Sequence, residues 1–403
     1  MTFTIQNARI FDGERLLEED TVICEGTQIV AVGKRLSPVG TSVDALGATL
    51  LPGLIDAHTH TSVDALRYAL AFGVTTELEM MGRWTLEERA RLEDRADLAD
   101  LRTAGFGVSA PGGHPSQLQR GGPPPGAAKT GQRHERPTVS TPDEAVAFVR
   151  ARVDEGSDYI KIMIEDGRVL GAPGLPVLSE ETIRAAVQEA HGHGKMALAH
   201  VLTAAATAQA IELGMDGLTH VFVDGPSTAA LVDAIAASGA FVTPCLVLNS
   251  SILGKSAAQL ADHEHVRHKL SDAWRQTLCS CFNTYPQGNF DDVLATVRTL
   301  HEAGVDILVG TDASYPMPHL GGLAHGASVH HELQLLVRAG LTPSEALRAA
   351  TALPARRFRL DDRGRVAPGM RADLLLVDGD PTKNVADTLA IRAVWRRGVQ
   401  LGS

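Results

Sequence analysis

The chain has 403 residues, of which 44% are hydrophobic, 21% charged and only 4% aromatic. Such a length and balance suit one large catalytic domain with a smaller one, or two to three medium domains, with mainly aliphatic cores. The formal net charge of −11 argues against a nucleic-acid partner, because there is no basic field to displace phosphate counterions.

The two ends of the chain have the same sequence pattern. The opening "MTFTIQNARIFDG" and the stretch "TVICEGTQIVAVG" alternate apolar and polar residues as strands do, and so do "ADLLLVDGD" and "IRAVWRRGVQL" near the other end. The opening also lacks the basic-then-apolar layout of a signal peptide. We therefore expect residues 1–50 and 361–403 to form one small β-domain, separate from residues 51–360.

Between these ends, short apolar strands alternate with Ala-rich amphipathic helices. The candidate strands are "GLIDAHTH", "GVTTELEM", "GFGVSA", "DYIKIMI", "KMALAH", "DGLTHVF", "AFVTPCLV" and "VDILVGTD". Helical patterns such as "TPDEAVAFVRARVDEG" and "SEETIRAAVQEAHGHG" open on Thr or Ser and close on Gly, as helix caps do. Eight strand-then-helix units predict an α/β fold, the (β/α)8 TIM barrel. An open doubly wound sheet is the alternative, but no Gly-rich phosphate turn follows the first strand.

Two segments interrupt this rhythm. Residues 110–137 follow the third candidate strand and are too rich in Gly and Pro for a helix, and residues 249–290 form a long excursion after the seventh. Loops on that side of a barrel line its mouth, so both segments are candidates for a lid or for substrate specificity. Simple surface insertions remain an equal alternative.

Unusual polar residues end five of the eight candidate strands. They are His58 and His60 on the first, Lys161 on the fourth, His200 on the fifth, His220 on the sixth and Asp312 on the eighth. Each alone has an ordinary explanation, such as a core histidine, a snorkelling lysine or a helix-capping aspartate. Catalytic groups of such barrels collect at the carboxyl ends of the strands, so together they indicate a metal site. Imidazole and carboxylate suit Zn²⁺, with Fe²⁺ or Mn²⁺ as alternatives.

Lys161 is the unusual member of this set, because an ammonium group repels a cation. A neutral amine can instead take up CO₂ to become a carbamate, an anionic ligand with two oxygens that can bridge two ions. The lysine is therefore compatible with a metal centre of two divalent ions.

These motifs resemble those of the amidohydrolase superfamily over nearly the whole chain. The resemblance rests on "LPGLIDAHTH", "YIKIMI", "ALAHV", "LTHVF", "VGTDAS" and "VAPGMRADLLLVDGD", in that order. The Lys on the fourth strand and "HHELQLLVRAGLTPSEALRAAT" are most similar to the prolidase-like dipeptidase branch, and the chain ends are similar to imidazolonepropionases. The resemblance implies a TIM barrel with a small β-sandwich domain built from both termini.

The resemblance also implies the roles of the site residues. His58 and His60 would hold the more buried ion, His200 and His220 the second, and a CO₂-derived carbamate on Lys161 would bridge the two. Asp312 would bind the first ion and act as general base for attack by a metal-activated hydroxide. Two further histidines are candidates for substrate binding: His114, which would also aid catalysis by polarising the substrate, and His325, which is the weaker of the two.

The leading hypothesis is a metal-dependent amidohydrolase that cleaves a dipeptide or an N-acyl amino acid. The alternatives are a hydrolase of a cyclic amide, carbamate, urea or lactone with the same centre, a mononuclear deaminase, and a catalytically silent binding protein. The deaminase is disfavoured because His200 lacks the HxxE pattern that such enzymes place after the fifth strand.

The cysteines and the apolar segments indicate the cellular compartment of the protein. Cys24, Cys245, Cys279 and Cys281 show neither zinc-ribbon nor CxxC spacing, and such sparse use favours a reducing compartment. Polar residues interrupt the most apolar stretch, "KMALAHVLTAAATAQAIELGM", so it is not expected to span a membrane. We expect a cytoplasmic homo-oligomer that acts on a small molecule.

Overall fold

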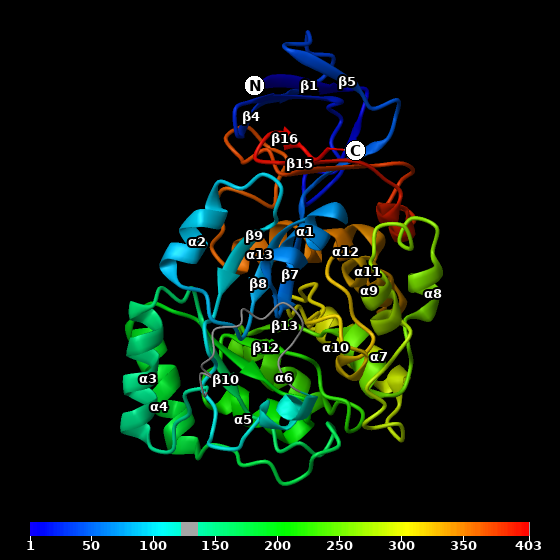
Figure 1. The fold of residues 1–403 in the computed structure, drawn as a ribbon. Helices are drawn as coiled ribbons and strands as arrows, with labels where there is room; N and C mark the ends of the chain where they lie inside the picture. Colours follow the sequence, from blue (N-terminus) through cyan, green and yellow to red (C-terminus); the bar gives the residue numbers. More distant parts are fainter. Residues whose placement is uncertain (122–135, 403) are drawn as a thin grey trace.

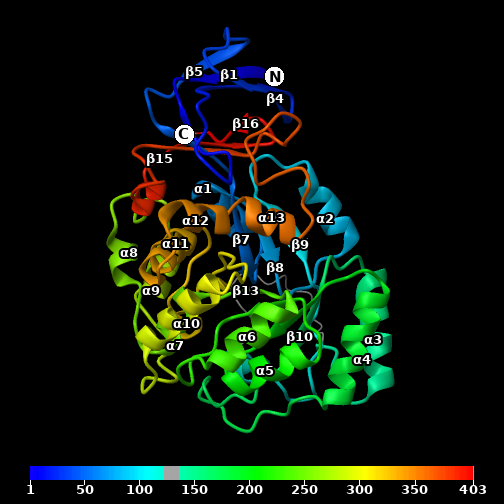
Figure 2. The ribbon, with the colours of Figure 1, turned by 180° about the vertical axis from the view of Figure 1, so that it is seen from behind.

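The computed structural model describes residues 1–121 and 136–402. Its two chain ends lie together in one small β-rich part, and the middle of the chain forms a larger part of strands and helices below it (Figure 1). The view from behind shows the same division (Figure 2). None of the helices in these two ranges is long and apolar enough to cross a membrane.

The β-rich part is a pair of sheets that both chain ends build. One sheet has the order β4-β3-β1-β5 and the other the order β16-β15-β14-β6-β2. The strands are β1 Thr2–Gln6, β2 Arg9–Ile10, β3 Thr21–Glu25, β4 Gln28–Gly33, β5 Thr41–Asp44, β6 Thr49–Pro52, β14 Leu374–Val377, β15 Ile391–Arg396 and β16 Val399–Gln400. Buried residues from both ends, such as Ile5 and Trp395, form a core of their own between the sheets. The domain bounds 1–50 with 361–403 remain a prediction.

The larger part contains seven parallel strands in two sheets, of orders β7-β8-β9 and β10-β11-β12-β13. These are β7 Leu54–Thr59, β8 Val74–Glu79, β9 Asp100–Thr103, β10 Ile160–Met163, β11 Ala197–His200, β12 Gly217–Thr219 and β13 Phe241–Thr243. They correspond to the candidate strands of the sequence with one exception. The third strand, β9, lies earlier than the predicted "GFGVSA". That segment begins at Gly105, which has a φ of +66°, and of its residues Val108 pairs as an isolated bridge with Ile162.

Backbone hydrogen bonds join these two sheets into a ring. The amide of Val108 donates to the carbonyl of Lys161 at 2.8 Å, which connects the first sheet to the second. On the other side, Leu308 donates to Val242 and Ala57 donates to Val309, both at 2.8 Å. Residues 306–309 therefore act as the eighth strand between β13 and β7, and the barrel closes.

Thirteen α-helices and three short 3₁₀ turns are present in the described ranges. They are α1 Val63–Ala71, α2 Leu86–Glu93, α3 Pro142–Asp154, α4 Glu180–Gly192, α5 Ala204–Glu212, α6 Ala229–Ser238, α7 Leu246–Ile252, α8 Ala258–Asp262, α9 Asp272–Leu278, α10 Phe290–Glu302, α11 Ala327–Ala339, α12 Pro343–Ala349, α13 Ala352–Arg357, η1 Ser116–Gly121, η2 Pro318–Leu320 and η3 Val385–Leu389. The caps agree with the sequence pattern. Thr141 forms a capping box with Glu144, Ser179 caps α4, and Gly239 ends α6 in the left-handed region.

The structure describes the two interrupting segments, 110–137 and 249–290, to different extents. Much of residues 249–290 folds into α7, α8 and α9, and Leu260, Val266 and Trp274 pack there with Phe72 and Ala327 in one apolar cluster. This part of the excursion therefore covers the outside of the barrel as a structural element. Of the loop 110–137, residues 122–135 lie outside the described residues, so its role as a lid stays a prediction.

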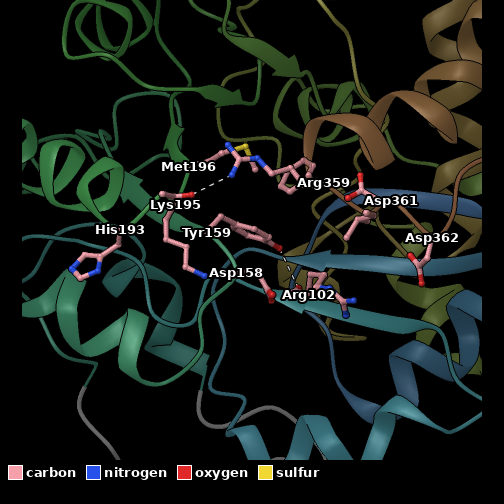
Figure 3. Close-up of a pocket in the computed structure, with 12 residues that line it drawn as sticks. Arg102, Asp158, Tyr159, His193, Lys195, Met196, Arg359, Asp361 and Asp362 are labelled. Carbon is pink, nitrogen blue, oxygen red and sulfur yellow. Dashed lines mark hydrogen bonds between the residues drawn. The ribbon is translucent and has the colours of Figure 1, made fainter.

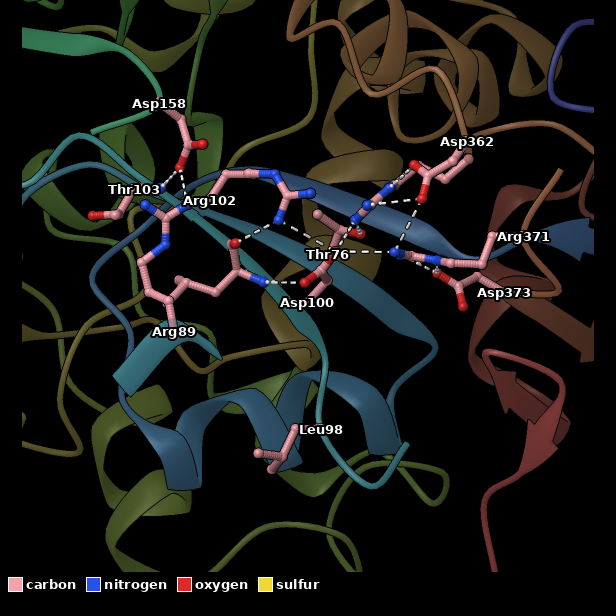
Figure 4. A network of polar contacts seen from close by, with 12 residues as sticks. Thr76, Arg89, Leu98, Asp100, Arg102, Thr103, Asp158, Asp362, Arg371 and Asp373 are labelled. Carbon is pink, nitrogen blue, oxygen red and sulfur yellow. Dashed lines mark hydrogen bonds and ion pairs between the residues drawn. The ribbon is translucent and has the colours of Figure 1, made fainter. Parts of the chain in front are cut away.

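A buried ionic network connects the barrel to the β-rich part (Figure 4). Asp100, the first residue of β9, pairs with Arg363 and with Arg371, whose Nη1 lies 3.0 Å from Asp100 Oδ2. Arg371 also pairs with Asp373, and Arg396 of β15 lies 3.2 Å from Asp373. Because these side chains are nearly inaccessible to solvent, each charge depends on its partners for compensation.

Candidate metal centre

The carboxyl ends of three barrel strands bring imidazole groups together. His58 lies in β7, His200 ends β11 and His220 directly follows β12. The ring of His220 lies 4.8 Å from that of His58 and 4.7 Å from that of His200, measured between centroids. The parallel barrel thus places residues that are far apart in sequence in mutual contact, as the sequence pattern predicts.

Asp312 joins this cluster from beyond the eighth strand. Its Oδ1 lies 3.2 Å from Nε2 of His58 and 2.9 Å from Nε2 of His60. The side chain of His60 is 26% exposed, whereas that of His58 is 1% exposed. Asp312 and His220 both adopt positive φ, 62° and 73°, a conformation that costs energy in residues other than glycine and recurs at functional sites.

Several buried ring nitrogens in this cluster make no hydrogen bond within the described ranges. They are Nδ1 of His58, Nε2 of His200 and both nitrogens of His220. Buried polar atoms without partners are rare in folded proteins and call for a ligand or an ion. His58, His60 and Asp312 present ligand atoms within 4.8 Å of one another, and this donor set of imidazoles and carboxylate matches the chemistry of zinc sites. The residues present therefore fit divalent metal ions.

The protonation of the cluster also suits a cation. Burial lowers the pKa of His58 to about 3 and the pKa of His200 to about 3, so both rings are neutral near pH 7. Burial alone would raise the pKa of Asp312, but His58 and His60 hold it well below its ordinary value. Neutral imidazoles and an ionised carboxylate are the forms in which these groups bind metals.

Lys161 lies in β10 with its side chain buried, and its Nζ donates a hydrogen bond to Oγ1 of Thr219 at the end of β12. Burial lowers the pKa of Lys161 to about 7. A substantial fraction of the amine is therefore neutral at physiological pH, which is the form that reacts with CO₂. The geometry brings this lysine into the same barrel interior as the histidines.

Buried partners fix the backbone that carries the ligands. Asp56 Oδ1 accepts hydrogen bonds from the amides of His58 and Thr311 at 3.2 and 3.0 Å, and Oδ2 accepts one from the Thr311 hydroxyl at 2.6 Å. This carboxylate thus ties β7 to the segment that ends at Asp312. Such outer contacts orient metal ligands and raise metal affinity.

The two candidate substrate-binding histidines have different surroundings. The ring of His114 stacks on that of His200 at 4.4 Å, and its Nδ1 lies 2.7 Å from the side-chain amide nitrogen of Gln117. His325 is fully buried, with Nδ1 donating to Glu77 at 2.7 Å and Nε2 to the carbonyl of Ser314 at 2.8 Å. His114 therefore adjoins the cluster, whereas both nitrogens of His325 are already engaged and its contacts hold the loop after Asp312.

The sequence pattern did not single out three further residues near the cluster. Glu79 ends β8 with an oxygen 4.0 Å from His60, and Glu165 follows β10 with Oε2 3.5 Å from Nε2 of His200. Cys245 follows β13 and presents a ligand atom within 4.8 Å of those of His58 and His220. All three lie at or just past strand ends, so the positional rule that identified the histidines could also have identified them.

A separate cavity of about 460 Å³ lies elsewhere on the barrel (Figure 3). Asp158 and Tyr159 line it directly before β10, and Lys195 and Met196 directly before β11. Since these are the amino ends of the strands, the cavity lies on the face opposite the histidine cluster and does not contribute to that site.

Comparison with known proteins identifies relatives of the whole chain. A model described as "Amidohydrolase family" matches residues 49–401. An imidazolonepropionase of Deinococcus deserti is 39% identical over 108 residues, and this match spans 26% of this chain and only 26% of that relative's length. A solved amidohydrolase structure is 26% identical with a TM-score of 0.74, covering 100% of this chain and 99% of its own. A prolidase solved with N-methylphosphonate-L-proline is 23% identical with a TM-score of 0.76 over 100% and 99% of the two chains. The predicted resemblance and the barrel-plus-small-domain fold are confirmed.

Proposed function

This chain is an enzyme of the amidohydrolase family, and we propose that it cleaves an amide bond of a dipeptide or an N-acyl amino acid with the help of two divalent metal ions. The observation that carries the proposal is the convergence of His58, His200, His220 and Asp312 around buried nitrogens without partners. Buried nitrogens without partners are costly unless an ion satisfies them.

The ligand roles follow the geometry. His58 and His60 would hold one ion together with Asp312, which touches both rings. His200 and His220 would hold the second ion, and the carbamate form of Lys161 would join the two. Divalent ions bound here, which we propose to be Zn²⁺, lower the pKa of the water they contact and polarise the scissile carbonyl.

The chain's own groups would then move protons and orient the substrate. Asp312 accepts the proton of the attacking water and passes it to the nitrogen of the leaving amine. Because the Gln117 amide faces Nδ1 of His114, the neutral ring carries its proton on Nε2. Burial lowers the pKa of His114 well below its ordinary value, so the ring stays a neutral donor. His114 would donate this proton in a hydrogen bond to the substrate's carbonyl oxygen.

Hydrolysis of a cyclic amide, carbamate, urea or lactone is the second candidate. The match to an imidazolonepropionase, at 39% identity over its 108 residues, favours it. A deaminase is less favoured, because His200 is followed by Val201, Leu202 and Thr203 in place of an HxxE pattern. We also propose a small-molecule substrate, because the net charge of −11 disfavours nucleic acid, and the cytoplasm, because cysteines are sparse. A homo-oligomer is proposed because the apolar exteriors of such barrels often associate.

A hydrolysis screen tests the proposal. The zinc-loaded protein is assayed on dipeptides, N-acyl amino acids, cyclic amides, carbamates and lactones, with the metal-free protein in parallel. The proposal expects amine release from a dipeptide or N-acyl amino acid that disappears when the metal is removed. Turnover confined to cyclic amides, carbamates or lactones would favour the second candidate, and metal-independent turnover would reject both.

A further inference from the structure

A buried cysteine lies against the histidine cluster. Cys245 directly follows Thr243 and Pro244 at the carboxyl end of β13 and is completely buried. Its sulfur and the ligand nitrogens of His58 and His220 all lie within 4.8 Å of one another. Three residues from three different strands therefore present donor atoms to one point in the barrel interior.

Within the described residues, most of these donor atoms have no hydrogen-bond partner. Both ring nitrogens of His220 and Nδ1 of His58 make no hydrogen bond, although their side chains are about 99% buried. The sulfur makes one long contact, 3.6 Å to the carbonyl of Thr243. A thiol is a weak hydrogen-bond donor and acceptor, so it does not satisfy the nitrogens of His220, whereas a cation held between the sulfur and His220 would.

The backbone at Cys245 is held from both sides. Its φ is 51°, which is strained for a side chain with a Cβ. The carboxylate of Glu332 in α11 accepts the amides of the next two residues, Leu246 and Val247, both at 2.8 Å. Asn249 donates to the carbonyl of Pro244 at 3.2 Å. Buried polar groups thus stabilise a strained position that aims the sulfur at the histidines.

We propose that Cys245 is a thiolate ligand of the metal centre, on the ion that His220 would hold. This inference rests on the proposed function, since it requires the ions of that centre. On binding, the S–H bond breaks, its proton passes to bulk water, and a sulfur–metal bond forms. Sulfur is a soft donor, so it biases the centre toward Zn²⁺ and away from Mg²⁺ or Mn²⁺.

X-ray absorption at the zinc edge tests this ligand directly. Zinc bound to sulfur shows a scattering distance of about 2.3 Å, distinct from about 2.0–2.1 Å for nitrogen and oxygen. The measurement compares the zinc-loaded wild type with Cys245→Ser and with Cys24→Ser, which alters a buried cysteine in the β-rich part. We expect the sulfur shell in the wild type and in Cys24→Ser and its loss in Cys245→Ser.

The triple variant Cys24→Ser/Cys279→Ser/Cys281→Ser keeps Cys245 as its single cysteine, so it decides the matter even if Cys245→Ser does not fold. Its sulfur shell must equal that of the wild type. A wild type that binds zinc and hydrolyses substrate without a sulfur shell overturns the thiolate ligand and leaves the proposed function intact. A wild type that binds no zinc rejects both.

Discussion

The proposed function gives Asp312 two roles, metal ligand and general base. Its Oδ1 touches the rings of His58 and His60, as a ligand must, and 18% of its side chain is exposed, which leaves access for a substrate. His58, by contrast, is buried, and the proposal gives it the role of metal ligand alone. At the scale of single residues, the account therefore separates groups that hold the ions from the group that also moves a proton.

Replacing Asp312 by Asn tests that separation. The amide oxygen can still bind a cation, but it cannot accept a proton, so zinc content should stay near that of the wild type while turnover falls by about 10²–10⁴-fold. Metal analysis and steady-state kinetics on the same preparation measure both. Unchanged turnover in Asp312→Asn would rule out the role of base.

Lys161→Ala tests the bridging ligand. Without the amine there is no carbamate, so we expect loss of the second ion and of activity, with partial recovery when a short carboxylate such as acetate is added. Lys195→Ala, which changes a lysine in the cavity on the opposite face, is the matched control and should keep both ions. Tight binding of both ions by Lys161→Ala would contradict the proposal.

At the scale of elements, the site depends on how the first and eighth strands are joined. The eighth segment pairs with β7 through individual backbone hydrogen bonds. Asp56 accepts two further hydrogen bonds across this pair, from the amide and the hydroxyl of Thr311, and a third within β7 from the amide of His58. An open edge at this seam would let Asp312 move away from the rings of His58 and His60. The seam is thus the part of the barrel on which the ligand geometry depends most.

Asp56→Asn weakens this seam, because the amide group cannot accept all three hydrogen bonds. We expect zinc affinity to fall about tenfold or more, measured by competition with a chelator. Asp64→Asn, an exposed change on α1, should leave affinity unchanged. Equal affinities in the two variants would show that Asp56 does not position the ligands.

The sequence predicts helices and strands well where neighbouring residues determine their ends. Ser, Thr and Gly at helix ends predicted the caps of α3, α4 and α6, and strand ends predicted the histidine cluster. It failed for the third strand, which lies before Gly105 and not after it. Cysteine spacing along the chain does not reveal Cys245, whereas its position just past the end of β13 does.

At the scale of the whole molecule, the amino end of β9 is anchored to the β-rich part by charge. Asp100 meets Arg363 and Arg371 in a region closed to solvent. Burial alone would raise the pKa of Asp100, but these guanidinium groups and that of Arg102 hold it far below its ordinary value. No sequence pattern predicts this network, since Asp100 lies more than two hundred residues from Arg363 and Arg371.

Asp100→Asn leaves buried guanidinium groups short of a counter-charge. We expect a loss of about 3 kcal/mol in the free energy of unfolding at pH 7, measured in urea. Glu87→Gln, which breaks the exposed pair with Arg91, should cost less than about 0.5 kcal/mol. A loss of similar size in both variants would contradict the importance of burial.

The loss of stability caused by Asp100→Asn should depend on pH. The pKa of Asp100 is lowered in the folded state, so its contribution is fully present above the unfolded value of about 3.9 and is lost as the pH falls further. The stability difference between wild type and Asp100→Asn should therefore be constant from neutral pH to about pH 5 and shrink in more acidic solution. A difference that shrinks toward neutral pH would assign the effect to another group.

The central claim is that six side chains between positions 58 and 312 hold a pair of cations. Metal analysis of the zinc-loaded protein after extensive dialysis, beside the double variant His58→Asn/His220→Asn, tests it most directly. The account predicts about two zinc ions per wild-type chain and none retained by the variant. Dialysed wild type that keeps no zinc, or a variant that keeps as much as the wild type, would contradict it.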